Sequence, residues 1–161
     1  FKEPLVYSSF DWAIKDDEGY FTILGRTDDV INVAGHRLGT REIEEAIQIH
    51  SAIAEVAVVG VDDKLKGQMP MAFAVVKDAS RVATPELAKA LEKEVMATVD
   101  GSLGAIARPG RVYFVTGLPK TRSGKMLRRS LQALAEGRDV GDLPTIDDAS
   151  TIEQIRNLLA S

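Results

Sequence analysis

Apolar residues recur along this chain at two spacings, and the spacing changes from segment to segment. Residues 55–61 and 72–76 are mostly apolar and rich in β-branched side chains, which is typical of central strands of a sheet. Leu87, Leu91 and Val95 instead follow one another at every fourth position, which predicts a helix with one face toward a core. The hydrophobic pattern therefore predicts a mixture of strands and helices.

Polar residues and prolines at the edges of these patterns predict where helices begin and end. Thr84 before Pro85 is a typical helix start, because threonine can cap the first free N–H groups and proline suits the first helical position. We expect Thr40 to cap another helix, in which Ile43 and Ile47 face the core. The other expected elements are a strand over 111–115, a helix over 126–135 closed by Gly137, and a last helix opened by a capping box at 150–153.

Two short turns separate paired strand-like segments near the start of the chain. One turn is the acidic, glycine-bearing stretch 16–19, and the other is Ala34-Gly35. The predicted strand pairs are 12–15 with 20–24 and 30–33 with 36–38. Together with the helices, they predict a small α+β domain with a central sheet of about three strands, flanking helices and a projecting β-hairpin.

The composition limits the classes of function. The chain has 161 residues, of which 45% are hydrophobic, so it can bury one sizeable core. Its formal net charge of −4 gives no general attraction to nucleic acid or to an acidic membrane, and no apolar run approaches the roughly 20 residues that span a bilayer. The absence of cysteine excludes disulfides and thiolate metal sites and fits a cytoplasmic protein. We therefore expect neither nucleic-acid nor membrane partners.

The first residues have the character of the interior of a longer protein. The chain begins at Phe1, without a methionine or a signal-peptide pattern. We therefore expect residues 1–27 to be the end of a preceding domain and residues 28–161 to form a domain of their own.

A candidate functional lysine, Lys125, stands at the end of the polar loop 118–125, whose sequence is LPKTRSGK. Its long cationic side chain and the start of the predicted helix just after it both favour anions such as phosphate. From residue type alone, a surface lysine without a function is the simpler interpretation, but the surrounding motif favours a functional one. The Gly-x4-Gly-Lys-Ser/Thr spacing of a phosphate-binding P-loop is absent.

A second motif, GRTDDVINVAGHRLGT, occupies residues 25–40. Asp28 and Asp29 are adjacent acids that would repel one another if both were buried, so at least one should be exposed or paired with Arg26. Ala34-Gly35 at the predicted hairpin tip leaves the backbone almost bare, so a thin ligand can run alongside it. This motif, like the lysine loop, is too polar to be part of a core.

Together the two motifs resemble the C-terminal domain of the acyl-adenylate-forming ligases, the family that contains the acyl-CoA synthetases. The resemblance covers nearly the whole chain, and the tail 141–148 makes it greater to ligases of the propionate type than to those of the acetate type. It implies that ATP and a short-chain carboxylic acid give an acyl-adenylate and pyrophosphate, after which coenzyme A displaces AMP. It also implies that the chain works with its own N-terminal domain, which would supply the acid pocket and most contacts to ATP and Mg²⁺, and that the chain alone is inactive.

The resemblance also assigns roles to single residues. Lys125 would act in adenylation, and family members are regulated at this position by a protein lysine acyltransferase and a deacylase. Asp28 would be the hinge about which the small domain turns between the two half-reactions. The resemblance also implies that Asp11 accepts hydrogen bonds from the ribose hydroxyls of ATP and that Arg26 contacts nucleotide oxygens. Arg37 would bind a phosphate of the nucleotide or of coenzyme A, and Ala34 and Gly35 would line the tunnel for coenzyme A.

Several alternatives stay open. His36 inside the hairpin is more simply structural than a general base, and His50 lies where acetate-CoA ligases are sometimes assigned a cation site, but two histidines without a carboxylate cluster do not predict a metal. Met96 stands where those ligases have an arginine for the coenzyme A nucleotide, and Lys93 could replace that contact. The other functions considered are an acetate-CoA ligase domain, a luciferase-like or peptide-synthetase adenylation domain, and a non-catalytic nucleotide-binding module of the same fold.

Overall fold

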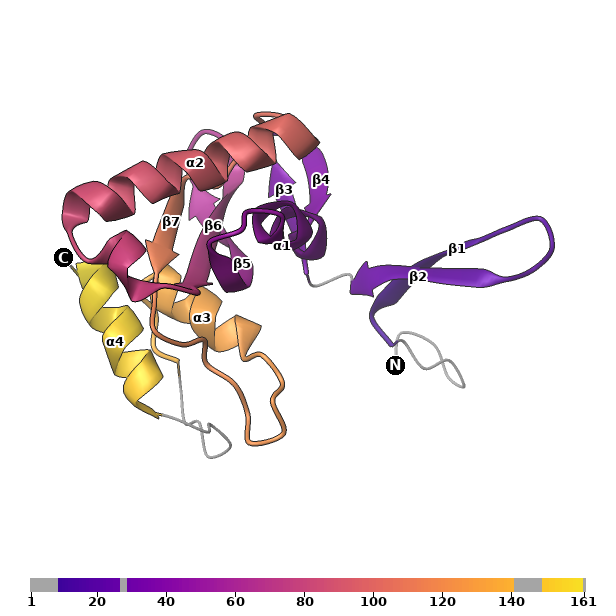
Figure 1. The fold of residues 1–161 in the computed structure, drawn as a ribbon. Helices are drawn as coiled ribbons and strands as arrows, with labels where there is room; N and C mark the ends of the chain where they lie inside the picture. The colour runs from indigo at the N-terminus through magenta and orange to yellow at the C-terminus, as the bar shows by residue number, and fades with distance from the viewer. Residues whose placement is uncertain (1–8, 27–28, 141–148, 161) are drawn as a thin grey trace.

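The computed structural model describes residues 9–26, 29–140 and 149–160, and it confirms the expected class of small α+β domain (Figure 1). In chain order the elements are β1 (Asp11–Lys15), β2 (Phe21–Arg26), β3 (Val30–Val33), β4 (His36–Gly39), α1 (Thr40–Gln48), β5 (Ile53–Asp63), β6 (Gly67–Val76), the 3₁₀ helix η1 (Ala79–Val82), α2 (Pro85–Leu103), β7 (Arg111–Phe114), α3 (Arg128–Ala135) and α4 (Ala149–Ala160).

The long strand β6 is the centre of a five-stranded sheet. β5 pairs with one edge of β6, antiparallel and along its whole length. On the other edge, β7 runs parallel to residues 71–74, and β3 meets β6 where Val33 lies opposite Gly67. The strand order is therefore β4-β3-β6-β5, with β7 also beside β6.

The three expected central strands are present, and the hairpin that was expected to project, β3–β4, joins the same sheet. The pairing of Val33 with Gly67 makes this connection. Gly67 has a φ of +81°, the left-handed conformation that glycine adopts without steric cost, at the point where the chain leaves the β5–β6 turn. The hairpin is therefore an edge of the sheet as well as a projection.

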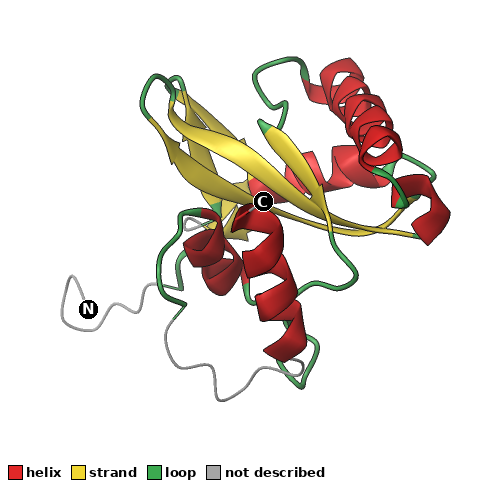
Figure 2. Cartoon of the chain, turned by 90° about the vertical axis from the view of Figure 1, so that its left-hand side faces the viewer, coloured by secondary structure: helices red, strands yellow, loops and turns green. Residues whose placement is uncertain are grey.

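Two hydrophobic clusters cover opposite faces of the sheet, and helices lie on both sides of it (Figure 2). Successive side chains of a strand point to opposite faces, so Val58 of β5 belongs to one cluster, whereas Ala57 and Val59 belong to the other. The buried helical side chains are Ile43, Ile47, Leu91 and Val95 of α1 and α2 on the first face, and Leu131, Leu134, Ile152 and Ile155 of α3 and α4 on the second.

The start of α2 confirms one prediction and corrects another. The hydroxyl of Thr84 accepts a hydrogen bond from the N–H of Leu87 at 3.3 Å, and Pro85 is the first helical residue. Leu91, Val95 and Val99 are buried, but Leu87 is 46% exposed, so the expectation that it faces the core was wrong. Four residues turn about 40° more than one full turn of the helix, so residues at every fourth position drift around its surface. Leu87, at one end of the series, therefore lies outside the buried face.

The start of α1 corrects the expected threonine cap. The N-cap position is Gly39, whose residue type offers no capping side chain, and Thr40 is already the first helical residue. Thr40 is only 3% exposed, and its hydroxyl has no hydrogen-bond partner within the described ranges. Its side chain therefore points inward, while its backbone N–H donates to the carbonyl of Asp29 at 3.0 Å.

The two C-terminal helices begin close to the expected positions. α3 starts at Arg128 rather than at Met126, because Met126 forms a β-bridge with Lys120. Gly137 follows α3 with a φ of +66°, as expected for a glycine that closes a helix. α4 starts at Ala149, so Ser150 lies within its first turn and not at the predicted cap position.

The β1–β2 hairpin stands away from the other elements (Figure 1). A two-stranded hairpin is marginally stable alone, and this one leaves four large apolar side chains exposed by 59–69%: Ile14, Tyr20, Phe21 and Ile23. These observations are consistent with a preceding domain that ends near residue 27, which stays a prediction. In the described part of the chain, no helix is both long and apolar enough to cross a membrane.

Candidate functional site

The loop that carries Lys125 is a closed turn between β7 and α3. The N–H of Leu127 donates to the carbonyl of Pro119 at 2.9 Å, and the N–H of Thr121 donates to the carbonyl of Lys125 at 2.8 Å. Gly124 turns the chain with a φ of +80°. The side chain of Lys125 is exposed. The sequence LPKTRSGK thus folds into a compact loop in which the side chain of Lys125 is exposed to solvent.

The base of this loop is attached to the rest of the domain. Leu118 and Pro119 are buried, and the ammonium of Lys120 lies 2.6 Å from the carboxylate of Glu55 on β5. The hydroxyl of Thr121 accepts a hydrogen bond from the N–H of Lys125 at 3.1 Å. Because the loop is bonded both within itself and to β5, Lys125 is expected to move with the domain as a whole.

The tip of the β3–β4 hairpin presents backbone, as its sequence predicts. Ala34 and Gly35 have φ values of +48° and +85°, so both residues are left-handed, as in the two-residue turns that suit the twist of a hairpin. A Cβ atom added at Gly35 would meet nothing within 4 Å. His36 and Arg37 follow on β4 with exposed side chains.

A second turn, between β5 and β6, supports this tip. The carbonyl of Lys66 accepts a hydrogen bond from the N–H of Ala34 at 2.8 Å. The carboxylate of Asp63 accepts bonds from the N–H groups of Lys66 and Leu65 at 2.8 and 2.9 Å, and these two donors lower the pKa of Asp63 below its ordinary value. Asp63 therefore holds in place the turn on which Ala34 rests.

Two candidate nucleotide residues face one another on the β1–β2 hairpin. Asp11 on β1 lies opposite Arg26 on β2, and both are exposed. Directly opposed residues on adjacent strands have Cβ atoms about 5 Å apart, close enough for both to contact one ligand. The hinge candidate Asp28, which follows this hairpin, lies outside the described residues, as does the tail 141–148.

The candidate residues fall into separate places. The Lys125 loop and the β3–β4 turn lie at opposite ends of the domain (Figure 1), and Asp11 and Arg26 lie on the detached hairpin. Arg37 is placed with Ala34 and Gly35, because it faces Asn32 across the same β3–β4 hairpin. The structure therefore offers several surfaces that could each face a ligand, and the two motifs do not converge on one pocket.

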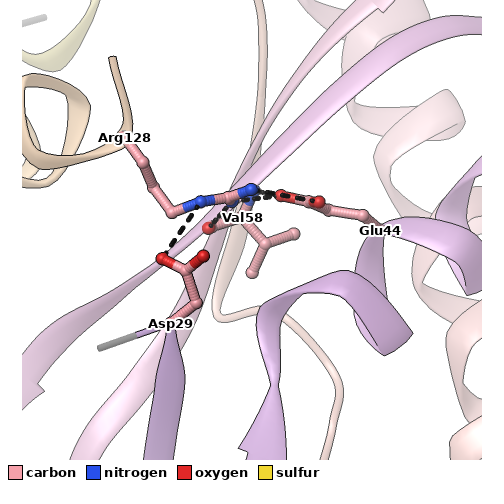
Figure 3. Close-up of polar contacts among 4 residues, drawn as sticks. All are labelled: Asp29, Glu44, Val58 and Arg128. Carbon is pink, nitrogen blue, oxygen red and sulfur yellow. Dashed lines mark hydrogen bonds and ion pairs between the residues drawn. The ribbon is translucent and has the colours of Figure 1, made fainter. Parts of the chain in front are cut away.

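Sequence reasoning missed a partly buried ionic cluster around Arg128, the first residue of α3 (Figure 3). Its guanidinium donates to both carboxylate oxygens of Glu44 on α1 and, at 2.8 Å, to the carbonyl of Val58 on β5. Its Nε lies 3.5 Å from a carboxylate oxygen of Asp29. The cluster borders a cavity of about 330 Å³ that is also lined by Thr40.

The charge state of Arg128 is fixed by these contacts. Burial acts to lower its pKa, but the hydrogen bonds and charge of Glu44, together with the charge of Asp29, outweigh burial and raise the pKa above its ordinary value. Arg128 and Glu44 are 84 positions apart. No local pattern in the sequence links them, although an arginine three positions after the candidate lysine was a signal that could have been examined.

The histidine and coenzyme A alternatives also have a structural context. His50 lies with Nε2 3.3 Å from the carboxylate of Glu94, and its Nδ1 accepts a hydrogen bond from the N–H of Ala52 at 3.3 Å. Among the described residues, no group of three or more histidines and acids could hold a metal ion. Met96 packs against the core, whereas Lys93 is exposed on the same helix.

Three comparisons place this chain among known proteins. The family model of the AMP-binding enzyme C-terminal domain matches residues 42–125. The propionate–CoA ligase of Escherichia coli K12 is 58% identical over 99% of this chain, and the acetyl-coenzyme A synthetase of Pyrobaculum arsenaticum is 50% identical over 95% of it. The chain spans 25% and 22% of the length of these two relatives.

The similarity extends to solved structures. The crystal structure of ATP-bound MatB from Rhodopseudomonas palustris matches with a TM-score of 0.65 and 29% sequence identity. The match covers 77% of this chain and 23% of that one. The structural comparison, like the sequence comparisons, aligns this chain with only a part of a longer protein.

Proposed function

The chain belongs to the family of AMP-binding enzyme C-terminal domains, as its two motifs predicted, and from this premise we propose that it serves an AMP-forming short-chain acyl-CoA synthetase. The proposed overall reaction converts propionate, ATP and coenzyme A into propionyl-CoA, AMP and pyrophosphate. In this proposal the chain is the C-terminal domain of the enzyme and is inactive alone, because a larger N-terminal domain holds the acid pocket and most contacts to ATP and Mg²⁺.

The observation that carries the proposal is the separation of the two motifs on one sheet. The Lys125 loop and the β3–β4 turn lie at opposite ends of the domain, so they do not line a single pocket (Figure 1). A domain that turns on a hinge can present first one end and then the other to the same cleft. Asp28 is the proposed hinge, at the junction between the detached hairpin and β3.

Lys125 acts in the first half-reaction. A carboxylate oxygen of the acid attacks the α-phosphate of ATP, and pyrophosphate leaves. Negative charge concentrates on the phosphate oxygens during this step, and an ammonium group placed beside them lowers the barrier. The exposed side chain and the compact loop of Lys125 support this role. Asp11 accepts hydrogen bonds from the ribose hydroxyls, and Arg26 donates to nucleotide oxygens.

The β3–β4 turn acts in the second half-reaction. After the domain turns, the bare backbone of Ala34 and Gly35 forms a wall of the tunnel along which the pantetheine arm of coenzyme A reaches the acyl-adenylate. The thiol sulfur then forms a bond to the acyl carbon and releases its proton to solvent, and AMP leaves with the electrons of the broken C–O bond. The exposed Arg37 on the same hairpin is placed to pair with a phosphate of the nucleotide or of coenzyme A.

Propionate is the proposed acid, with acetate as the second candidate. This order follows the identities of 58% to a propionate–CoA ligase and 50% to an acetyl-coenzyme A synthetase. A non-catalytic nucleotide-binding module of the same fold is the alternative from another class. The position of the Lys125 loop and the β3–β4 turn at opposite ends of the domain favours the enzyme, because a module that only binds nucleotide needs one such surface.

Acylation of Lys125 is proposed as a means of regulation. An exposed lysine is accessible to a protein lysine acyltransferase and a deacylase, and acylation removes the charge on which adenylation depends. The proposed location is the cytoplasm, where ATP, coenzyme A and these modifying enzymes are all present.

The test compares the full-length enzyme that carries this chain with its Lys125→Ala variant in two assays. The first assay is pyrophosphate exchange with propionate, acetate or butyrate, and the second is thioester formation from supplied propionyl-adenylate. We expect the variant to lose exchange and to keep thioester formation, and the wild type to exchange fastest with propionate. Equal rates for variant and wild type in both assays would overturn the role of Lys125.

A further inference from the structure

Arg128 joins the base of the Lys125 loop to the start of β3, and the proposed function does not yet use it. It lies three positions after Lys125 and contacts Asp29, the first described residue after the proposed hinge Asp28 (Figure 3). Asp29 and Arg128 are almost a hundred positions apart in the sequence.

We propose that Arg128 is a positioning residue for adenylation, which fixes the base of the Lys125 loop relative to the residue next to the hinge. The inference rests on the proposed function. In that function, Arg128 would link the orientation of the chain at the hinge to the position of Lys125. While the contact between Asp29 and Arg128 holds, the orientation of the chain just after the hinge sets the position of the base of the Lys125 loop.

The contacts of Arg128 divide into a fixed side and a changeable side. On the fixed side, Glu44 is paired with both terminal nitrogens of Arg128 and also accepts a hydrogen bond from the N–H of Val58 at 2.8 Å. The side chains of Arg128 and Glu44 are 25% and 15% exposed, so water competes little for these bonds. The guanidinium is therefore held on α1 and β5.

The changeable side is the contact with Asp29. The separation of 3.5 Å between Nε and the carboxylate oxygen is longer than the hydrogen bond of 2.8 Å to the carbonyl of Val58, and the Asp29 side chain is 34% exposed. A longer, more hydrated ion pair can break while Arg128 keeps its other partners. This asymmetry suits a contact that holds the domain in the orientation for adenylation and yields when the domain turns.

The ion pair between Lys120 and Glu55 offers a comparison at the other end of the same loop. It also attaches the loop to β5, at 2.6 Å, but its side chains are 35% and 48% exposed and it does not reach β3. If any support of the loop were sufficient, loss of this pair and loss of the Asp29 contact would have similar effects. The proposal predicts that only the Asp29 contact distinguishes the two half-reactions.

The experiment uses the full-length enzyme with Asp29→Asn, Arg128→Lys and the double variant. Pyrophosphate exchange with propionate and thioester formation from supplied propionyl-adenylate are measured for each. We expect each single variant to lower the kcat of exchange by about tenfold or more, because a small misplacement of a catalytic group is costly. The KM values for ATP and propionate and the thioester rate should stay within about twofold of wild type, because neither depends on where Lys125 points. The double variant should be no slower than the slower single one, because both remove the same contact.

Controls separate this inference from the proposed function. Arg41→Gln, which removes an exposed ion pair with Glu45, should leave both assays unchanged. Asp29→Asn leaves the Glu44 pair intact, so it stays informative if Arg128→Lys unfolds. Parallel loss of both half-reactions, or multiplication of the two single effects, would overturn the positioning role. If Lys125→Ala loses exchange while the Asp29 and Arg128 variants do not, this inference fails and the proposed function stands.

Discussion

The Lys125 loop and the β3–β4 turn share one local feature, although the proposed function gives them different roles. Each contains a glycine in the left-handed conformation, Gly124 with a φ of +80° and Gly35 with a φ of +85°. The first turn is followed by the exposed side chain of Lys125, whereas the second presents backbone. A charge that must reach a phosphate needs a long side chain, but a wall along a thin ligand needs the absence of one. In the proposed function, a turn that contains a left-handed glycine would therefore serve each half-reaction, and the difference is in what the neighbouring positions carry.

The sharpest way to test this comparison is to remove the charge of Lys125 without changing its length much. Lys125→Gln mimics an acylated lysine, and we expect it to slow pyrophosphate exchange by about 10²- to 10³-fold, as for loss of one electrostatic contact to a transition state. Thioester formation from supplied propionyl-adenylate should be retained. Lys125→Arg keeps the charge and should retain more exchange than Lys125→Gln. Equal loss in the two variants would show that charge is not the property that matters.

A matched pair of glycine substitutions tests whether the two turns serve opposite half-reactions. A Cβ atom at Gly35 or Gly124 would meet nothing within 4 Å, and both positions have a positive φ, so Gly35→Val and Gly124→Val introduce similar backbone strain of about 1–2 kcal/mol. We expect Gly35→Val to slow thioester formation by about tenfold and Gly124→Val to slow pyrophosphate exchange by a similar factor.

The thermal unfolding midpoints of these two variants provide the control, since both should fall by a similar small amount. If each glycine variant slowed both half-reactions equally, the division of labour between the two turns would be wrong.

A smaller effect is expected from the support of the β3–β4 turn. The pKa of Asp63 is lower in the fold than in the unfolded chain, so its ionised form stabilises the fold above the unfolded pKa. This stabilisation is lost as the pH falls through the lower, folded-state pKa. Asp63→Asn keeps an acceptor oxygen but does not titrate, so it should unfold at lower urea than wild type at pH 7, and the difference should shrink in acid. A difference that does not depend on pH would contradict this assignment.

The smallest effect is expected at the Lys120–Glu55 ion pair. Both side chains are partly exposed, and such pairs contribute about 0.2–1 kcal/mol. Lys120→Gln should therefore lower the free energy of unfolding by no more than this amount and slow both half-reactions less than twofold. Urea unfolding at low and high salt checks the result, because the difference from wild type should decrease as salt screens the pair. A large, salt-independent loss would indicate that the loop depends on Lys120 in another way.

Features decided by neighbouring residues could be predicted from the sequence. The Ala34-Gly35 turn, the Thr84 cap with Pro85, and the buried Ile43 and Ile47 all follow from spacing and residue type within one or two turns of chain. The family resemblance added the roles of the two motifs.

Features decided by distant contacts could not be predicted in this way. Thr40 was expected to cap α1, but its side chain lies inside the fold, and its backbone N–H donates to the carbonyl of Asp29. The pairing of β3 with β6 and the bonds between Arg128 and Glu44 depend on how elements far apart in sequence come together. A single sequence shows which residues could form such bonds, but it does not show which partners they meet.

The length of strand β6 also determines how far apart the β3–β4 turn and the Lys125 loop lie. The β3–β4 turn lies beside the start of β6, and the Lys125 loop follows β7, which runs along the middle of β6, so the number of residues in this strand largely sets the distance between the two tips. Exchanging one side chain for another along β6 leaves that distance unchanged as long as the strand persists. Insertion of two residues, in contrast, would lengthen the strand by about 7 Å. The spacing of the two tips therefore depends on how many residues β6 contains, and not on which side chains it carries.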